Sequence, residues 1–183
     1  MKKTLLIVIL LICATGAFAQ KNTSETYIEQ FKDNAIAIMH ETGIPASIIL
    51  GIAMHESSNG NSTIAQNLNN QFGVKGGSGA VFYKHNKKVH SSYKKYDSIL
   101  ESFEDFARIM TERKQFSHLA NDLTQYDYEK WIKGIQHAGY ASSRKWGAQV
   151  LAIIHKYRLN DLDATPTAQI PPKQPQLADN GKQ

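Results

Sequence analysis

The sequence predicts a mostly α-helical α+β domain that carries one small β-hairpin. In several segments before residue 70 and after residue 97, apolar residues recur every three or four positions, which is the period of an α-helix. Between these segments, glycines at positions 73, 76, 77 and 79 lead into residues 81–93, which we interpret as a hairpin that turns near His85. Two short strands cannot bury a core alone, so we expect them to form a lobe on a helical body.

The N-terminus has the features of a secretory signal peptide. Lys2 and Lys3 precede an apolar run that ends at the small-residue pattern before Ala19. We therefore expect a signal peptide over 1–19 and an exported chain that begins at residue 20. A lipoprotein signal through Cys13 is the weaker alternative, because Ile12 stands where a small residue is required. Cys13 is the single cysteine and leaves with the signal, so the exported domain has no disulfide.

The charge of the chain does not point to a nucleic acid partner. The formal net charge is +5 and falls to +3 when Lys2 and Lys3 leave with the signal. No basic block with interleaved aromatic residues occurs, and export argues against a DNA-binding role. A mildly basic exported protein suits an anionic envelope polymer. We expect a monomer that has no stable insertion in the membrane once the signal is removed.

The segments of the domain can be assigned in order along the chain. A helix over 24–40 begins at Thr23 or Ser24, a second opens after Pro45 and ends near Ser57, and a short third covers 63–68. After the hairpin, a helix starts at Ser98, another starts at Asp127, and the last is capped by Ser142 or Ser143. Residues 20–163 thus form one domain, and 164–183 form a disordered tail rich in proline and glutamine.

Glu56 is the residue most suggestive of chemistry. It continues the apolar series of Ile49, Ile52 and Ala53 along one face of its helix, and the sequence after Ser57 ends that helix at once. The negative end of the helix dipole and partial burial both favour the protonated form of the carboxyl group. A protonated carboxylic acid is what glycoside hydrolysis needs to protonate a leaving sugar oxygen. A capping or salt-bridged glutamate is the alternative.

Other chemistries are poorly supported by the sequence. The segment 55–59 resembles a zinc-protease helix motif, but Asn59 stands where the second histidine is required. The other histidines have no ligand spacing, and no Gly-x-Ser-x-Gly or phosphate-binding glycine motif occurs. We therefore expect no metal and no cofactor.

Four segments, in order along the chain, resemble the bacterial peptidoglycan N-acetylglucosaminidase domain of glycoside hydrolase family 73, the domain found in flagellar rod-cap hydrolases and autolysins. Residues 46–57 resemble the family's helix that ends in the catalytic glutamate. Residues 69–76 (NNQFGVKG) resemble its N-N-x-F-G-I-K-G loop, and residues 93–106 resemble its F-R-x-Y-x-S stretch and the helix that follows. Residues 138–142 (AGYAS) are similar to the A-G-Y-A-T segment that carries an important tyrosine.

This resemblance implies a lysozyme-like helical body with a small β-hairpin lobe beside a cleft, and the hydrolysis of N-acetylglucosaminyl-β-1,4-N-acetylmuramic acid bonds in peptidoglycan glycan strands. It implies that Glu56 is the general acid and Tyr140 the active-site tyrosine. The substrate-binding residues that it implies at the cleft are Asn70, Phe72, Gly73 and Tyr96.

The sequence departs from the family pattern in the hairpin, where many members have a second carboxylate. Residues 80–93 contain no Asp or Glu, and Ser143 replaces a frequent Asp. A double displacement by two close carboxylates is therefore disfavoured. Our hypothesis is that the 2-acetamido group of the substrate attacks the anomeric carbon, while Glu56 protonates the leaving oxygen and Tyr140 stabilises the intermediate. The alternatives are a lytic transglycosylase or muramidase, and a non-catalytic peptidoglycan-binding or assembly protein.

Overall fold

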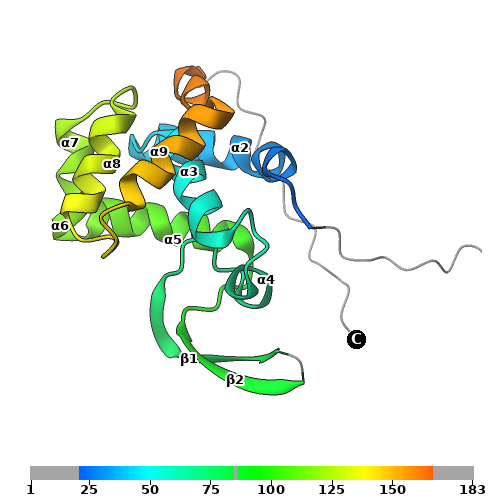
Figure 1. Ribbon diagram of the computed structural model, residues 1–183. Coiled ribbons are helices and arrows are strands. Elements are labelled where there is room, and N and C mark those ends of the chain that lie inside the picture. The colour runs from blue at the N-terminus through cyan, green and yellow to red at the C-terminus, as the bar shows by residue number, and fades with distance from the viewer. Residues whose placement is uncertain (1–20, 85, 167–183) are drawn as a thin grey trace, which may run out of the picture.

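A helical body and a projecting β-hairpin make up the protein in the computed structural model, which describes residues 21–84 and 86–166 (Figure 1). The predicted signal peptide and residues 167–183 of the predicted tail lie outside the described residues. The described elements, in order, are α2 (Ser24–Thr42), α3 (Ala46–Ser57), α4 (Thr63–Leu68), β1 (Lys75–Lys84), β2 (Lys87–Tyr93), α5 (Ile99–Glu112), α6 (Lys114–Ser117), α7 (Leu119–Asp122), α8 (Tyr128–His137), α9 (Trp146–Tyr157) and the 3-10 helix η1 (Leu159–Ala164).

Helix α3 lies at the centre of the helical body. It is apolar on every side rather than on one face, and it packs against α2, α8, α9 and η1. Gly51 allows the close approach of α9, because a methyl group at this position would lie only 2.8 Å from Cγ1 of Ile154. Pro45 begins α3 without a side-chain cap, and Asp163 of η1 supplies the missing acceptor for the backbone N–H of Ser47 at 2.8 Å. The central helix is therefore held by a segment 116 residues away along the chain.

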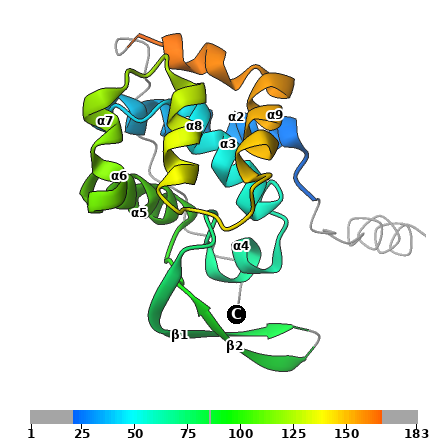
Figure 2. The same cartoon turned by 60° about the vertical axis from the view of Figure 1, so that its left-hand side comes forward.

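The hairpin extends from one end of the helical body, as two views of the molecule show (Figure 2). Strands β1 and β2 pair antiparallel with Phe82 opposite Val89, and the register shifts between Lys75 and Ala80. The chain returns to the body through backbone hydrogen bonds from Lys94 to Val74 and from Tyr96 to Leu68. The predicted hairpin and its place between the helices are confirmed.

A row of aromatic rings forms the part of the core beneath the hairpin. Phe72 stacks on Phe106, with 4.3 Å between ring centroids, and meets Phe103 edge to face at 5.0 Å. The row continues to Tyr140, whose ring packs against Phe106 and also against Phe116 and Trp146. These contacts join the loop after α4 to α5 and to the segment before α9.

None of the described helices is long and apolar enough to cross a membrane.

Two local features differ from the sequence-based expectations. The last helix begins at Trp146 with Lys145 at the N-cap position, so neither Ser142 nor Ser143 caps it. Ser143 instead takes part in a tight turn, where its hydroxyl accepts from the N–H of Lys145 and its carbonyl accepts from the N–H of Trp146. The short helices α6, α7 and η1 were not predicted. They have little periodicity and, unlike the similarly short α4 with Ser62 at its start, no side-chain hydrogen bond at the N-cap.

Candidate active site

A cleft of about 650 Å³ lies where the helical body meets the hairpin. Its walls come from the end of α3, the loop after α4, the first residue of β1, the last residue of β2, the turn between α5 and α6, and residues 139–143 with Trp146. Glu56, Asn70, Phe72, Gly73 and Tyr140 all line it. Five of the six residues that the sequence singled out therefore meet at one cavity.

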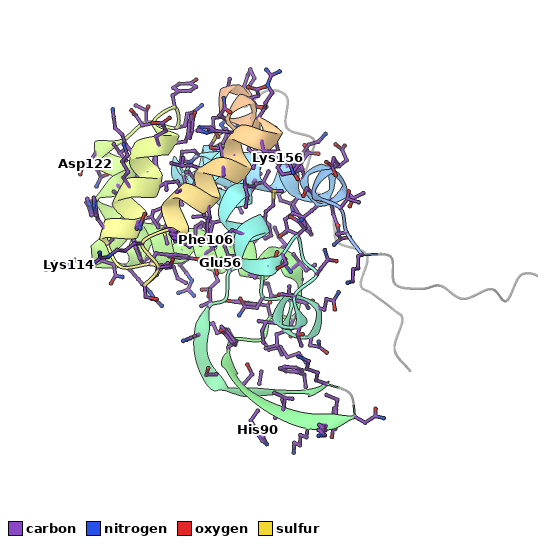
Figure 3. All side chains as sticks on the ribbon, viewed as in Figure 1. Glu56, His90, Phe106, Lys114, Asp122 and Lys156 are labelled. Carbon is purple, nitrogen blue, oxygen red and sulfur yellow. The ribbon has the colours of Figure 1, made fainter. Side chains whose placement is uncertain are left out.

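Glu56 occupies the last turn of α3, because Ser58 adopts a left-handed conformation with φ of 54° and ends the helix. Figure 3 places this residue at the end of α3 that is nearest the hairpin. Its side chain is half-buried, and Oε1 accepts a hydrogen bond of 2.8 Å from the indole Nε1–H of Trp146. Trp146 begins α9 and is itself buried. The indole group thus holds the carboxyl group in one orientation.

This hydrogen bond makes the two oxygens of Glu56 unequal. An indole N–H only donates, so Oε1 acts as an acceptor. Because the carbonyl oxygen of a protonated carboxyl group is a better acceptor than its hydroxyl oxygen, this bond favours Oε2 as the oxygen that carries the proton. Oε2 faces Gly73, because a methyl group added to Gly73 would lie 3.8 Å from it and 3.8 Å from the Tyr93 ring. The oxygen that can donate a proton therefore lies beside Gly73, which also lines the cleft.

Tyr140 lies against the same group of side chains. Its hydroxyl donates to the carbonyl oxygen of Phe72 at 3.3 Å, and its ring centroid lies 5.2 Å from that of Trp146. Burial and the neighbouring Glu56 carboxylate raise the pKa of Tyr140 well above its usual range. The phenol thus stays neutral and keeps its proton in the bond to Phe72, which leaves its lone pairs free to accept.

The loop after α4 is shaped by Asn70, which is 1% exposed. Its side-chain amide accepts from the N–H of Val74 at 3.0 Å and donates to the carbonyl oxygens of Val74 and Lys94 at 2.9 and 2.8 Å. Gly73 has φ of 63°, a conformation that side-chain-bearing residues rarely adopt. Asn70 therefore orders the loop, and Gly73 lets the backbone turn beside Glu56.

Tyr96 is the one predicted site residue that the structure does not bring to the cleft. Its side chain is buried beside α5, and its hydroxyl donates to Oδ2 of Asp105 at 2.7 Å. Asp105 also accepts from Lys94 at 2.9 Å and pairs with Arg108. Burial and the bond to Asp105 raise the pKa of Tyr96. This residue anchors the return of the hairpin to the body.

The cleft also contains residues that the sequence motifs do not assign to the site. Trp146 is one of them, because no local pattern connects it with Glu56, which is 90 residues away. Tyr93, Lys75 and Arg113 also line the cleft.

Glu56 is the sole carboxylate among the described lining residues. In the described part of the chain, no group of three or more His, Cys, Asp or Glu residues is placed to hold a metal ion.

The protein combines a helical body with a small hairpin, which is the fold of lysozyme-like glycoside hydrolases. Its site has an acid at the helix end that faces the cleft. The family model described as glucosaminidase, mannosyl-glycoprotein endo-beta-N-acetylglucosaminidase, matches residues 32–159. The chain therefore belongs to the glucosaminidase family of glycoside hydrolases, as the sequence motifs predicted.

Known proteins agree with this assignment. The exo-glucosaminidase LytG of Bacillus subtilis (strain 168) is 26% identical over 153 residues, which cover 76% of this chain and 53% of LytG. The chain thus spans about half the length of this curated relative.

Solved structures share the fold. The catalytic domain of the autolysin Auto from Listeria monocytogenes matches with a TM-score of 0.62 and 23% identity, over 80% of this chain and 91% of that one. The glycoside hydrolase domain of FlgJ from Salmonella typhimurium matches with a TM-score of 0.61 and 21% identity, over 75% of this chain and 89% of that one. The predicted lysozyme-like architecture is confirmed.

Proposed function

We propose that the protein is an exported peptidoglycan hydrolase that cleaves the β-1,4 bond between N-acetylglucosamine and N-acetylmuramic acid, with Glu56 as its general acid. The observation that carries this proposal is the hydrogen bond from Trp146, which leaves Oε2 of Glu56 toward Gly73 in the cleft. Membership of the glucosaminidase family supports the class of bond. The names of LytG and Auto, an exo-glucosaminidase and an autolysin, support a role at the cell wall.

In the first step, Oε2 of Glu56 gives its proton to the glycosidic oxygen as the bond from that oxygen to the anomeric carbon breaks. No second carboxylate lines the described cleft, so the carbonyl oxygen of the substrate's own 2-acetamido group forms the new bond to this carbon. The product of this step is a cyclic oxazolinium ion and a free sugar hydroxyl. Water then attacks the anomeric carbon, gives a proton to Glu56 and restores the acetamido group.

Tyr140 is suited to stabilise the oxazolinium ion as a hydrogen-bond acceptor. Its proton is engaged with the carbonyl oxygen of Phe72, so its free lone pairs can accept from the acetamido N–H, which becomes more positive as the ring closes. A neutral phenol fits this role, since a phenolate beside Glu56 would be repelled by that carboxylate. Other side chains that line the cleft are the aromatic ring of Tyr93 and the cationic groups of Lys75 and Arg113.

The test is the digestion of purified sacculi followed by mass spectrometry of the new chain ends. The unmodified protein should release reducing N-acetylglucosamine ends, and Glu56→Gln should lower the rate by about a thousandfold or more. The glutamine oxygen can still accept from Trp146, so the fold of the site is preserved. Glu101→Gln is the matched control, because Glu101 also lies near a helix end but bonds to the N–H of Asp97 outside the cleft.

Each other outcome contradicts a stated part of the proposal. Full lytic activity in Glu56→Gln would remove Glu56 from the chemistry. Reducing or anhydro muramic ends would assign a muramidase or a lytic transglycosylase, and bound but uncut polymer would assign a binding module. Export is tested separately, because the mature protein recovered outside the cytoplasm should begin at Gln20.

A further inference from the structure

One face of the hairpin carries two large apolar side chains that are exposed to solvent. In the antiparallel register, Val81 lies opposite His90 and Tyr83 lies opposite Lys88, so these four side chains share one face of the two-stranded ribbon. We call this the outer face. Val81 is 40% exposed and Tyr83 is 67% exposed, whereas Phe82 on the opposite face is 8% exposed. Figure 3 shows His90 at the edge of the hairpin farthest from the helical body.

The hairpin is also cationic. Residues 75–93 contain no Asp or Glu, and the described lysines of this segment, Lys75, Lys84, Lys87 and Lys88, are exposed. Within the described chain, no ion pair involves these lysines, although Lys94 just after the hairpin pairs with Asp105. Uncompensated charges of one sign on a projecting element favour an anionic partner.

An exposed tyrosine ring beside lysines fits a polymer that combines sugar rings with anionic groups. The ring offers an apolar surface to a sugar face, and the ammonium groups meet carboxylates. Peptidoglycan has both, because its glycan strands carry stem peptides with free carboxylates. The first and last residues of the hairpin, Lys75 and Tyr93, pair with each other and line the cleft. The ribbon is therefore continuous with the site where the glycan is expected to bind.

We propose that the end of the hairpin, with Tyr83 and Lys88 on the outer face and Lys84 and Lys87 on the opposite face, binds a second peptidoglycan strand. It does so through the carboxylates of the stem peptides of that strand, while the first strand occupies the cleft. This inference rests on the proposed function. It assigns a substrate-binding role to the hairpin, in which many family members have a second carboxylate. The hairpin would keep the enzyme on its polymer between cleavage events. Charge attraction of this kind is weakened by salt.

The experiment measures binding in the Glu56→Gln background, so that the polymer stays uncut. Sacculi are compared with the same material after an amidase has removed the stem peptides. Each amide hydrolysis leaves one carboxylate on the muramic acid and removes the carboxylates of the peptide. The protein should bind intact sacculi at low salt about tenfold more tightly than stripped glycan, and this preference should fade as salt rises. The triple change Lys84→Glu, Lys87→Glu and Lys88→Glu should abolish the preference while binding to stripped glycan stays the same.

A matched control carries the same change of charge on the helical body. Lys114, Lys133 and Lys156 are exposed residues of α6, α8 and α9, and Figure 3 shows the first and last of them well away from His90. Their replacement by Glu should leave the preference for intact sacculi in place. A milder hairpin variant with Gln at the three lysines should lose part of the preference, and its melting curve checks that the fold is preserved.

Several results would overturn the proposal. These are equal binding to intact and stripped glycan, an equal loss in the control variant, or tighter binding to teichoic acid or anionic vesicles than to sacculi. Failure of the proposed function has a different signature, since it would appear as the wrong chain ends in the digestion of sacculi by the unmodified protein. The two ideas can therefore fail independently.

Discussion

Asp163 should make the stability of this protein rise as the pH falls from neutral toward 4.5. The carboxyl group is 1% exposed, and it accepts from the N–H of Ser47 at 2.8 Å and from the hydroxyl of Ser47 at 2.6 Å. Burial outweighs these two hydrogen bonds and raises the pKa of Asp163 to about 6. In the unfolded chain an aspartate titrates near about 3.9. The folded state therefore binds a proton more readily than the unfolded state.

The magnitude follows from this difference. A group whose folded pKa is raised contributes its full stabilisation below the unfolded pKa and loses it as pH rises through the folded pKa. For Asp163 the whole effect is about 3 kcal/mol, of which about 2 kcal/mol develops between pH 7.5 and pH 4.5. Asn at this position cannot titrate but keeps one acceptor oxygen for Ser47.

The assay is urea unfolding of the unmodified protein and of Asp163→Asn at both pH values, followed by tryptophan fluorescence. Other groups titrate in both proteins and cancel in the difference. This difference should shift by about 2 kcal/mol in favour of the unmodified protein at the lower pH. Asp161→Asn is the control, since Asp161 is exposed in the same 3-10 helix and its pair with Arg158 should change the difference by less than about 0.5 kcal/mol. A constant or opposite shift for Asp163→Asn would refute the reasoning.

Three further predictions concern the packing that holds the cleft. Trp146→Phe should lower kcat by about tenfold or more with KM little changed, because Glu56 loses the donor that orients it, and steady-state kinetics on soluble glycan fragments measures the split. Gly51→Ala should lower the free energy of unfolding by about 1 to 3 kcal/mol, because its methyl group forces α9 away from α3, and an unchanged melting temperature would contradict this. Asp105→Asn should cost about 2 to 4 kcal/mol near neutral pH, because it removes the buried charge that Lys94 and Tyr96 bond and leaves them one neutral acceptor oxygen. Although burial opposes it, these bonds lower the pKa of Asp105, so the loss should shrink in acid unfolding titrations.

Local patterns predicted much of the fold. The helix over 63–68 agrees with the structure, and the helix predicted over 24–40 is confirmed with two more residues at its end. The hairpin turns where the sequence indicated. These features depend on periodicity, on caps such as Ser98 and on turn residues, all of which act over a few positions. The family motifs also indicated six site residues, and five of these line the cleft.

The sequence could not predict which way an extended residue points. Tyr96 follows directly on the hairpin, and its ring turns toward Asp105 in α5 rather than into the cleft. Asn70 lines the cleft, yet its amide group holds the loop and the segment directly after the hairpin. Both outcomes depend on how the hairpin returns to the body, and that geometry has no period in the sequence.

The sequence by itself determined that an acid stands at the end of an apolar helix, and that a glycine-rich loop, an acid-free hairpin and a tyrosine segment follow it in order. Only the tertiary structure decided how that acid is held. Trp146 reaches Glu56 across 90 residues, and Asp163 reaches the other end of the same helix across 116. A hydrogen bond between residues so far apart leaves no local pattern, because its geometry arises from the packing of α9 and η1 on α3.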